Sequence, residues 1–308
     1  MTRHFLADDD LSPAEQAAVL DLAVALKRTP YDAKPLAGPR TVATIYDKPT
    51  LRTQVSFGAG IAELGGHPLL VDGGLAGIGT RESVPDVARV LGRQAAMIVW
   101  RTYAQTRIEE MAAYAGVPVV NALTDEFHPC QLLADLLTVR EHKGDLAGLV
   151  VTFLGDAACN VGNSWLLAGA TAGMHVRVSA PEGYLPPPAM LERAAAIAAG
   201  TGGSVSIESD PAVAVASADV VVTDTWVSMG REEESRARLA DLAAHSLTAA
   251  LLAEARDDAI VMHCLPAYRG KEIAAEVLDG PQSVVWDEAE NRRHAQKAII
   301  TWLLEQTT

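Results

Sequence analysis

Residues 47–57, DKPTLRTQVSF, combine two hydroxyl side chains and an arginine where a strand is expected to run into a helix. The apolar run TVATIY precedes them, so Thr50, Arg52 and Thr53 fall at the start of that helix. A helix N-terminus offers free N–H groups and a partial positive charge to a phosphate, and an arginine in the first turn adds a bidentate donor. An ordinary threonine cap with a solvated arginine fits the same pattern at least as well. A nucleotide-hydrolysing loop is not expected, because the chain lacks G-x-x-x-x-G-K-[ST].

Two further segments supply donors for a carbonyl or phosphate oxygen. Arg101 follows the apolar run AAMIVW, although a surface arginine lying over Trp100 gives the same pattern. In FHPCQ, His128 and Gln131 are three residues apart at an expected helix start, so both side chains can face one ligand. A neutral histidine there can donate to a carbonyl oxygen. A capping histidine with a solvated glutamine explains the segment about equally well.

Two segments of the second half have side chains suited to an amino acid. Asn160 lies in FLGDAACNVGNS, which resembles a Rossmann-type turn but lacks G-x-G-x-x-G, so a dinucleotide is not expected. Asp224 and Ser228 of DTWVSMG are four residues apart after an apolar run, and the carboxylate could pair with a substrate ammonium. Helix capping by Asp156 or Asn160, and a loop-closing Asp224, are the alternative interpretations.

The segment HCLP places His263 and Cys264 next to each other after the apolar run AIVM. Adjacent side chains at a strand end point apart, so they make a poor nucleophilic dyad. The chain has neither H-E-x-x-H nor another set of ligands with metal-site spacing, so we expect no metal.

Positioning these residues requires strands that alternate with helices along the whole chain. Apolar runs predict strands at 41–47, 67–74, 95–102, 117–123, 149–156, 175–181, 204–209, 219–226, 258–266 and 283–290. Helical spacing predicts helices at 11–28, 56–66, 83–94, 107–116, 128–144, 160–173, 188–202, 211–218 and 291–306. This alternation favours α/β architecture with two doubly wound parallel sheets, whose ligands bind beyond the carboxyl ends of the strands.

Composition narrows the possible partners. With 308 residues and 49% hydrophobic residues, two globular domains are expected, divided near residues 140 to 150. The net charge of −14 argues against nucleic acid as a partner. Three widely spaced cysteines favour reduced thiols, and no apolar run has the length of a signal core or membrane span. We therefore expect a cytoplasmic protein with no membrane partner.

Taken together, FHPCQ, DTWVSMG, HCLPAYRG and WDEAENRRHAQKA resemble the ornithine carbamoyltransferases in order and spacing, and the resemblance extends from RHFL to the closing helix. It implies carbamoyl transfer from carbamoyl phosphate to the side-chain amine of L-ornithine, giving L-citrulline and phosphate in arginine biosynthesis. It also implies a homotrimer or a multiple of trimers, and a reaction that needs no metal or organic cofactor. The implied domains are residues 1–142 for carbamoyl phosphate and 143–290 for ornithine, with the helix 291–308 crossing back to the first domain.

The resemblance assigns roles to residues at two sites. The residues implied for carbamoyl phosphate are Thr50, Leu51, Arg52, Thr53, Arg101, His128, Gln131, Cys264, Leu265 and Arg292. Those implied for the amino acid are Asn160, Asp224, Ser228 and Met229. Thr53, Arg101 and His128 would polarise the carbamoyl oxygen. Gln131 and the carbonyls of Cys264 and Leu265 would hold its NH2 group, and Cys264 would lie beside the attacking amine.

Three positions depart from the usual pattern of the family, which reads Ser-Thr-Arg-Thr-Arg at residues 50–54. Leu51 removes a hydroxyl and Gln54 removes a positive charge, while Gly77 stands where a loop glutamine is usual. All three changes concern carbamoyl phosphate, so the sequence predicts a weakened or reshaped phosphate site. A paralogue acting on another diamino acid, and a non-catalytic amino-acid-binding homologue, are the alternatives.

Overall fold

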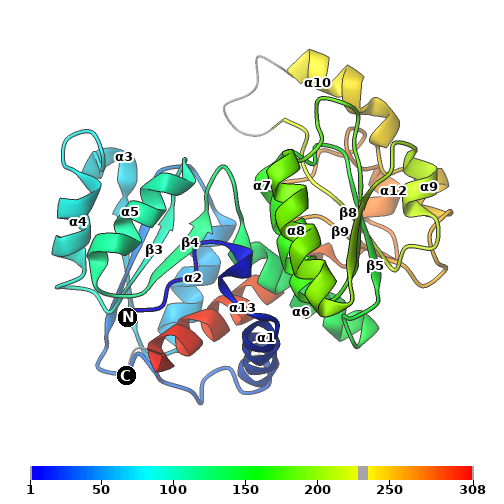
Figure 1. The fold of residues 1–308 in the computed structure, drawn as a ribbon. Coiled ribbons are helices and arrows are strands. Elements are labelled where there is room, and N and C mark those ends of the chain that lie inside the picture. The colour runs from blue at the N-terminus through cyan, green and yellow to red at the C-terminus, as the bar shows by residue number, and fades with distance from the viewer. Residues whose placement is uncertain (1, 228–234, 307–308) are drawn as a thin grey trace. The chain divides into compact units, whose positions relative to one another are not determined.

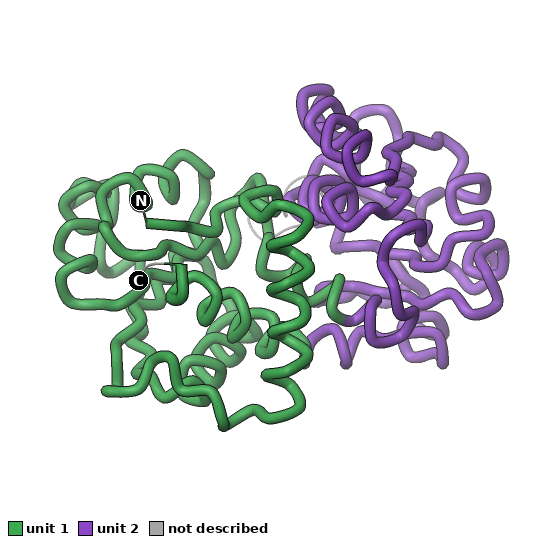
Figure 2. Tube along the Cα trace, turned by 60° about the horizontal axis from the view of Figure 1, so that its bottom comes forward, with its two compact units in different colours: residues 1–137, 290–308 green, residues 138–289 purple. Residues whose placement is uncertain are grey.

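The computed structural model describes residues 2–227 and 235–306, and the chain forms two compact units. Unit 1 comprises Met1–Leu137 and Glu290–Thr308, and unit 2 comprises Thr138–Ala289 (Figure 2). Both are parallel sheets flanked by helices (Figure 1), which confirms the predicted fold class. Within the described ranges, no helix combines the length and the apolar character that crossing a bilayer demands.

Unit 1 contains a four-stranded parallel sheet in the order β2-β1-β3-β4. Its strands are β1 (Thr41–Tyr46), β2 (His67–Asp72), β3 (Met97–Arg101) and β4 (Val119–Leu123). Its helices are α1 (Pro13–Arg28), α2 (Arg52–Glu63), α3 (Gly73–Ala76), α4 (Val84–Leu91) and α5 (Gln105–Ala115), with the 3-10 turn η1 (Asp8–Asp10) before them. Two helices, α6 (Pro129–Lys143) and α13 (Val285–Glu305), contain the points where the chain passes from one unit to the other.

Strand alternation decides which residues of unit 1 are available to a ligand. Ile45 of β1 pairs with Trp100 of β3, and both are buried in a core cluster with residues of α4 and α5. Successive side chains of a strand point to opposite faces, so the next pair in the register, Tyr46 and Arg101, faces away from that cluster. The final residues of β1 and β3 are thus placed side by side on the other face.

Unit 2 contains a five-stranded parallel sheet in the order β7-β6-β5-β8-β9. Its strands are β5 (Val150–Leu154), β6 (His175–Ser179), β7 (Ser204–Ile207), β8 (Val220–Thr223) and β9 (Ile260–Met262). The helices are α7 (Asn160–Thr171), α8 (Pro188–Thr201), α9 (Pro211–Val215), α10 (Ser235–Leu242), α11 (Ala249–Leu252) and α12 (Ala275–Leu278), with the 3-10 turn η3 (Ala243–His245). The chain leaves β5 toward β6 on one side and later returns to β8 on the other, which makes the end of β5 a topological switch point.

The predicted strand at 283–290 is wrong, because helix α13 already begins at Val285. Its buried positions follow helical spacing, as Val285, Glu288, Arg292 and Ala295 are all covered. A short apolar run such as SVVW has no decisive periodicity of its own. The acidic residues of the first turn favour a helix N-terminus, and the helical pattern continues through the rest of the segment.

Candidate active site

The anion motif of unit 1 lies between the end of β1 and the first turn of α2. Leu51 is the N-cap residue and Arg52 begins the helix, so Thr53 lies inside the first turn. The side chain of Thr53 is fully buried, and its hydroxyl accepts a hydrogen bond from Nη2 of Arg292 at 2.9 Å. The threonine-cap interpretation therefore does not describe this motif. Thr53 instead connects α2 to an arginine that is 239 residues later in the chain.

His128, which precedes α6, is buried and lies within the electrostatic influence of three arginines. Burial lowers the pKa of the His128 imidazole well below its usual value, and the positive charges of Arg292, Arg101 and Arg52 lower it further. The imidazole is therefore neutral at physiological pH and can donate one hydrogen bond without carrying charge. The structure thus brings together the arginines, the histidine and Thr53 that the sequence assigns to the donor.

Tyr46, the last residue of β1, is a buried residue that sequence reasoning did not single out and that the charges of Arg292 and Arg101 influence. Burial raises the pKa of its phenol to about 12, against the opposing effects of the Thr44 hydrogen bond and of Arg292 and Arg101. The hydroxyl consequently keeps its proton next to two guanidinium groups. Its position as the last residue of the strand before the anion motif is the signal that could have identified it.

The amide of Gln131 is oriented by a carboxylate one turn later in α6. Nε2 of Gln131 donates to Oδ1 of Asp135 at 2.8 Å, and both side chains are buried. An ionised carboxylate only accepts hydrogen bonds, so the NH2 of the amide must face Asp135. The carbonyl oxygen of Gln131 therefore points the other way, as an acceptor.

A second network fixes the start of the anion motif to the loop that contains Gly77. Oδ2 of Asp47 accepts from Oγ1 of Thr102 at 2.6 Å and from Nη2 of Arg107 at 3.4 Å. Nη2 of Arg107 also donates to the carbonyl of Ile78 at 2.9 Å. Gly77 has a left-handed φ of 64°, and a Cβ there would lie 2.9 Å from the Cβ of Arg81. The loop is therefore shaped for glycine, and a glutamine side chain would strain it.

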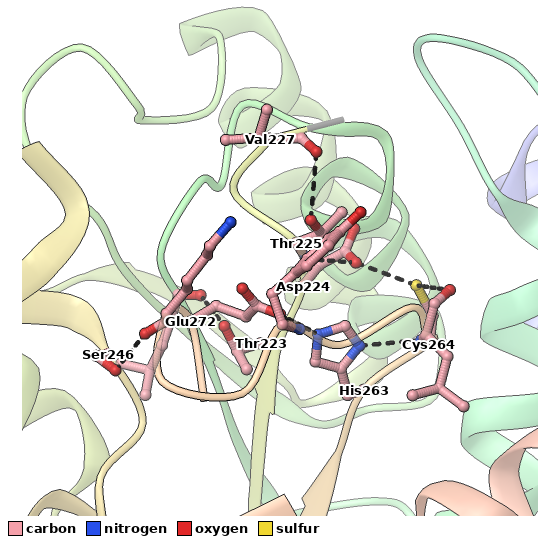
Figure 3. A network of polar contacts seen from close by, with 12 residues as sticks. Thr223, Asp224, Thr225, Val227, Ser246, His263, Cys264 and Glu272 are labelled. Carbon is pink, nitrogen blue, oxygen red and sulfur yellow. Dashed lines mark hydrogen bonds and ion pairs between the residues drawn. The ribbon is translucent and has the colours of Figure 1, made fainter. Parts of the chain in front are cut away.

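In unit 2, the candidate acceptor residues follow β5, β8 and β9, which are neighbours in the sheet. Asn160 is the first residue of α7, and Asp224 and Cys264 lie just beyond the ends of β8 and β9. Sγ of Cys264 donates to Oδ1 of Asp224 at 3.2 Å, and the backbone N–H of Thr225 donates to the same oxygen at 2.7 Å (Figure 3). Ser228 and Met229 lie outside the described residues.

A second thiol lies near the same carboxylate. Cys159 is the N-cap of α7, and its sulfur accepts from the N–H of Gly162 at 3.3 Å. Burial raises the pKa of the Cys159 thiol well above its usual value, and the negative charges of Asp224 and Asp156 raise it further. The Cys159 thiol therefore keeps its proton at neutral pH.

Both ring nitrogens of His263 have partners other than the sulfur of Cys264 (Figure 3). The N–H of Leu265 donates to its Nδ1 at 2.9 Å, and its Nε2 lies 3.3 Å from Oε1 of Glu272. Since a backbone N–H can only donate, the ring proton resides on Nε2 and is shared with Glu272. This geometry supports the expectation that His263 and Cys264 are not a nucleophilic dyad. Leu265 has a left-handed φ of 59°, so the His263 contact holds it in a strained conformation.

Asp224, His263 and Cys264 bring potential ligand atoms within 4.8 Å of one another, a cluster that could hold a metal ion. Both ring nitrogens of His263 already have partners, and a metal would have to displace one of them. The cluster as it stands is better suited to hydrogen bonding. The absence of a metal from the reaction stays a prediction.

Solved structures of ornithine carbamoyltransferases have this architecture. An ornithine carbamoyltransferase from Pyrococcus furiosus matches with a TM-score of 0.93 and 41% identity, covering 97% of this chain and 96% of that chain. One from Gloeobacter violaceus matches with a TM-score of 0.89 and 45% identity, covering 98% of each chain. The fold and the two sets of site residues therefore define a carbamoyltransferase-type protein.

Sequence comparisons narrow this class to one family. The model of the "Aspartate/ornithine carbamoyltransferase, carbamoyl-P binding domain" matches residues 3–141, and that of the "Asp/Orn binding domain" matches residues 147–303. The chain belongs to the aspartate/ornithine carbamoyltransferase family, as its motifs predict. An ornithine carbamoyltransferase of Clavibacter michiganensis subsp. michiganensis is 65% identical over 307 residues, covering 100% of both chains. One of Renibacterium salmoninarum is 59% identical over 311 residues, again covering 100% of both.

Proposed function

We propose that this chain transfers the carbamoyl group of carbamoyl phosphate to the side-chain amine of L-ornithine, giving L-citrulline and phosphate in arginine biosynthesis. The observation that carries the proposal is the neutral, buried His128 among Arg292, Arg101 and Arg52. Such a cluster suits a phosphorylated carbonyl compound, because it offers cationic groups for the phosphate and a neutral donor for the carbonyl oxygen. Full-length similarity to ornithine carbamoyltransferases supports the same reaction.

Unit 1 binds the donor. The phosphate is held by the first turn of α2 and by arginines, through Thr50, Leu51, Arg52, Thr53, Arg101 and Arg292. Leu51 takes part through its backbone N–H, and its side chain is 72% exposed. Gln131 accepts from the carbamoyl NH2, a role that the Asp135 contact favours because it turns the amide oxygen away from the carboxylate. The backbone carbonyls of Cys264 and Leu265 in unit 2 serve the same NH2 group.

Unit 2 binds the acceptor. Asn160 and Asp224, with Ser228 and Met229, hold the amino acid end of ornithine. Cys264 lies beside the attacking amine. Its S–H donates to Asp224, so the sulfur lone pairs remain as weak acceptors for the amine N–H groups.

The proposed positions of the donor and the acceptor lead to the following reaction. A free alkyl amine is mostly protonated at pH 7, and desolvation next to cationic groups lowers its pKa until the nucleophilic form is available. The amine attacks the carbamoyl carbon, and charge develops on the carbamoyl oxygen. Arg101, His128 and Thr53 stabilise that oxyanion by a few kcal/mol as preorganised donors. Phosphate then leaves with the bonding electron pair, and the amine releases its proton.

Steady-state kinetics with carbamoyl phosphate and ornithine tests the proposal. We expect the wild type to form citrulline and phosphate in equal amounts. The Asp224→Asn variant should have a raised KM for ornithine. Asp219→Asn is a matched control, because Asp219 is an aspartate of unit 2 that binds the Val150 N–H and Arg256. If saturating substrates give no citrulline, the assignment is wrong.

Leu51 and Gln54 favour a second candidate, a homologue with an impaired donor site. Both side chains are exposed at the start of α2, where the family usually has a hydroxyl and a positive charge. Calorimetry distinguishes this candidate from the carbamoyltransferase, because ornithine binding without carbamoyl phosphate binding indicates a non-catalytic binding protein. A separate assay with a panel of acceptors tests a third alternative. Turnover of another diamino acid in that assay indicates a paralogue.

We also propose that the chain assembles as a homotrimer or a multiple of trimers. Three neighbouring elements of unit 1 expose large apolar side chains, namely Val55 of α2, Leu69 and Leu70 of β2 and Leu75 of α3. Leu69 and Leu70 point to opposite faces of β2, but β2 is an edge strand, so the apolar side chains on either side of this edge are suited to burial against another copy. Sedimentation should give three times the mass of one chain or a multiple of it. Leu70→Asp should lower that mass, whereas Val213→Asp on exposed α9 should not.

The cytoplasmic location and the absence of nucleic-acid and membrane partners, all expected from the sequence, stay predictions.

A further inference from the structure

Arg238 of α10 is a buried arginine that the reaction above does not use. Only 7% of it is exposed, and its guanidinium lies 4.9 Å from the centre of the Tyr184 ring. Two hydrogen bonds connect it to different segments of unit 2. Its Nη2 donates to Oδ2 of Asp156, and its Nε donates to the carbonyl of Trp226 at 2.6 Å. An arginine can make both contacts at once because its donors are arranged in a rigid fork.

Asp156 is the point at which this arginine reaches the turn after β5. Its other oxygen, Oδ1, accepts from the N–H of Ala158 at 3.2 Å, within the turn that leads into α7. The N–H of Ala157 donates to the carbonyl of Tyr184 at 3.0 Å, so the turn also contacts the residue that stacks on Arg238. The orientation of the first turn of α7, where Asn160 lies, therefore depends on the Asp156 carboxylate.

Trp226 is the point at which Arg238 reaches the segment after β8. It is buried and follows Asp224 by two residues. A Cβ on Gly155 would lie 2.6 Å from Nε1 of Trp226, so the turn after β5 packs directly on this indole. The two segments that present Asn160 and Asp224 thus touch each other, and Arg238 binds both.

We propose that Arg238 is a positioning residue for the amino acid acceptor, setting the spacing between Asn160 and Asp224. The inference rests on the proposed function and adds a determinant of acceptor affinity. Removal of one member of a buried ion pair leaves an uncompensated charge, which the surrounding segments relieve by moving. A buried polar group that loses its partner costs about 1–3 kcal/mol, which corresponds to roughly a tenfold to hundredfold loss of affinity. Loss of Arg238 should therefore weaken acceptor binding while carbamoyl phosphate binding in unit 1 is retained.

The test compares the wild type with Arg238→Lys and Arg238→Ala under saturating carbamoyl phosphate. We expect the KM for ornithine to rise roughly tenfold or more in both variants, with the KM for carbamoyl phosphate changed less than about twofold. Added guanidinium at millimolar concentration should partly restore the KM for ornithine in Arg238→Ala, because the cation can enter the vacated position beside Asp156. A merely structural arginine would lower the melting temperature without this selectivity.

Arg256→Ala is the matched control, since this exposed arginine of unit 2 pairs with Asp219 and Asp258 and should leave both KM values unchanged. If Arg238→Ala does not fold, Arg238→Lys retains the charge and decides the question. Unchanged KM for ornithine, or equal increases for both substrates, overturns the inference. An inactive wild type instead overturns the proposed function, and calorimetric titration with ornithine then still measures whether Arg238 affects acceptor binding.

Discussion

Nε2 of Gln131 lies 2.8 Å from Oδ1 of Asp135, one helical turn away in α6. The two ends of a side-chain amide are nearly identical in shape but opposite in hydrogen bonding. A buried carboxylate at this distance selects one of the two orientations. In the proposed reaction, that orientation presents the Gln131 oxygen to the carbamoyl NH2.

The first prediction concerns this orientation. An asparagine at position 135 has nearly the same shape but can present either an oxygen or an NH2, so Asp135→Asn should allow the Gln131 amide to flip. We expect kcat/KM for carbamoyl phosphate to fall roughly tenfold or more, since a mispaired buried polar group costs about 1–3 kcal/mol. In a Gln131→Ala background the same substitution should have little effect on kcat/KM, as a double-mutant cycle measures. Equal effects in both backgrounds would show that Asp135 acts independently of the amide.

The second prediction concerns the contact between Thr53 and Arg292. Thr53→Val keeps the shape of the side chain and removes the oxygen that accepts from Nη2 of Arg292. The guanidinium loses its orientation, so we expect the KM for carbamoyl phosphate to rise roughly tenfold, corresponding to about 1.4 kcal/mol. Thr171→Val is the matched control, because this buried hydroxyl donates to a carbonyl within α7 of unit 2. A similar rise in KM for the control would argue against a specific role of Thr53.

The third prediction concerns the pH dependence of stability. Burial and the neighbouring arginines lower the pKa of His128 in the folded chain, so the unfolded chain binds more protons below the ordinary histidine pKa of about 6.5. Stability is therefore fully present above this pH and is lost as the pH falls below it. Denaturant unfolding at pH 7 and pH 5 should show a smaller loss for His128→Gln than for the wild type. The pKa values of His4, His245 and His294 are also lowered, so the variant should reduce the loss without abolishing it.

The fourth prediction concerns the altered anion motif. Leu51 and Gln54 are both exposed, so Leu51→Thr and Gln54→Arg can be combined without disturbing the core. The double variant adds a hydroxyl and a positive charge at the start of α2, and we expect carbamoyl phosphate to bind more tightly. Calorimetry at two salt concentrations measures the effect, which should decrease at high salt because the added charge is exposed. An unchanged affinity would indicate that these positions lie outside the phosphate site.

The sequence by itself determined most of the alternation of strands and helices, because the apolar periodicity of a segment depends on which of its faces is buried. It predicted no helix for α10 or for the short α3, α11 and α12. It also determined the family, because FHPCQ, DTWVSMG and HCLP are local strings with a fixed order. The apolar run SVVW at 283–286 is too short for its periodicity to be decisive. The sequence predicted a strand there, but helix α13 begins at Val285.

The tertiary structure decided everything that depends on contacts between distant segments. Thr53 is bonded to Arg292, which no local pattern near residue 53 indicates, and Tyr46 joins the site because of its register with Arg101. In the sequence, Arg238 is one of several charged residues in a segment for which no helix or strand was predicted, yet it is buried and binds Asp156 and Trp226. The burial and pairing of a polar side chain depend on which segments pack around it, and that information is absent from the spacing of residues along one segment.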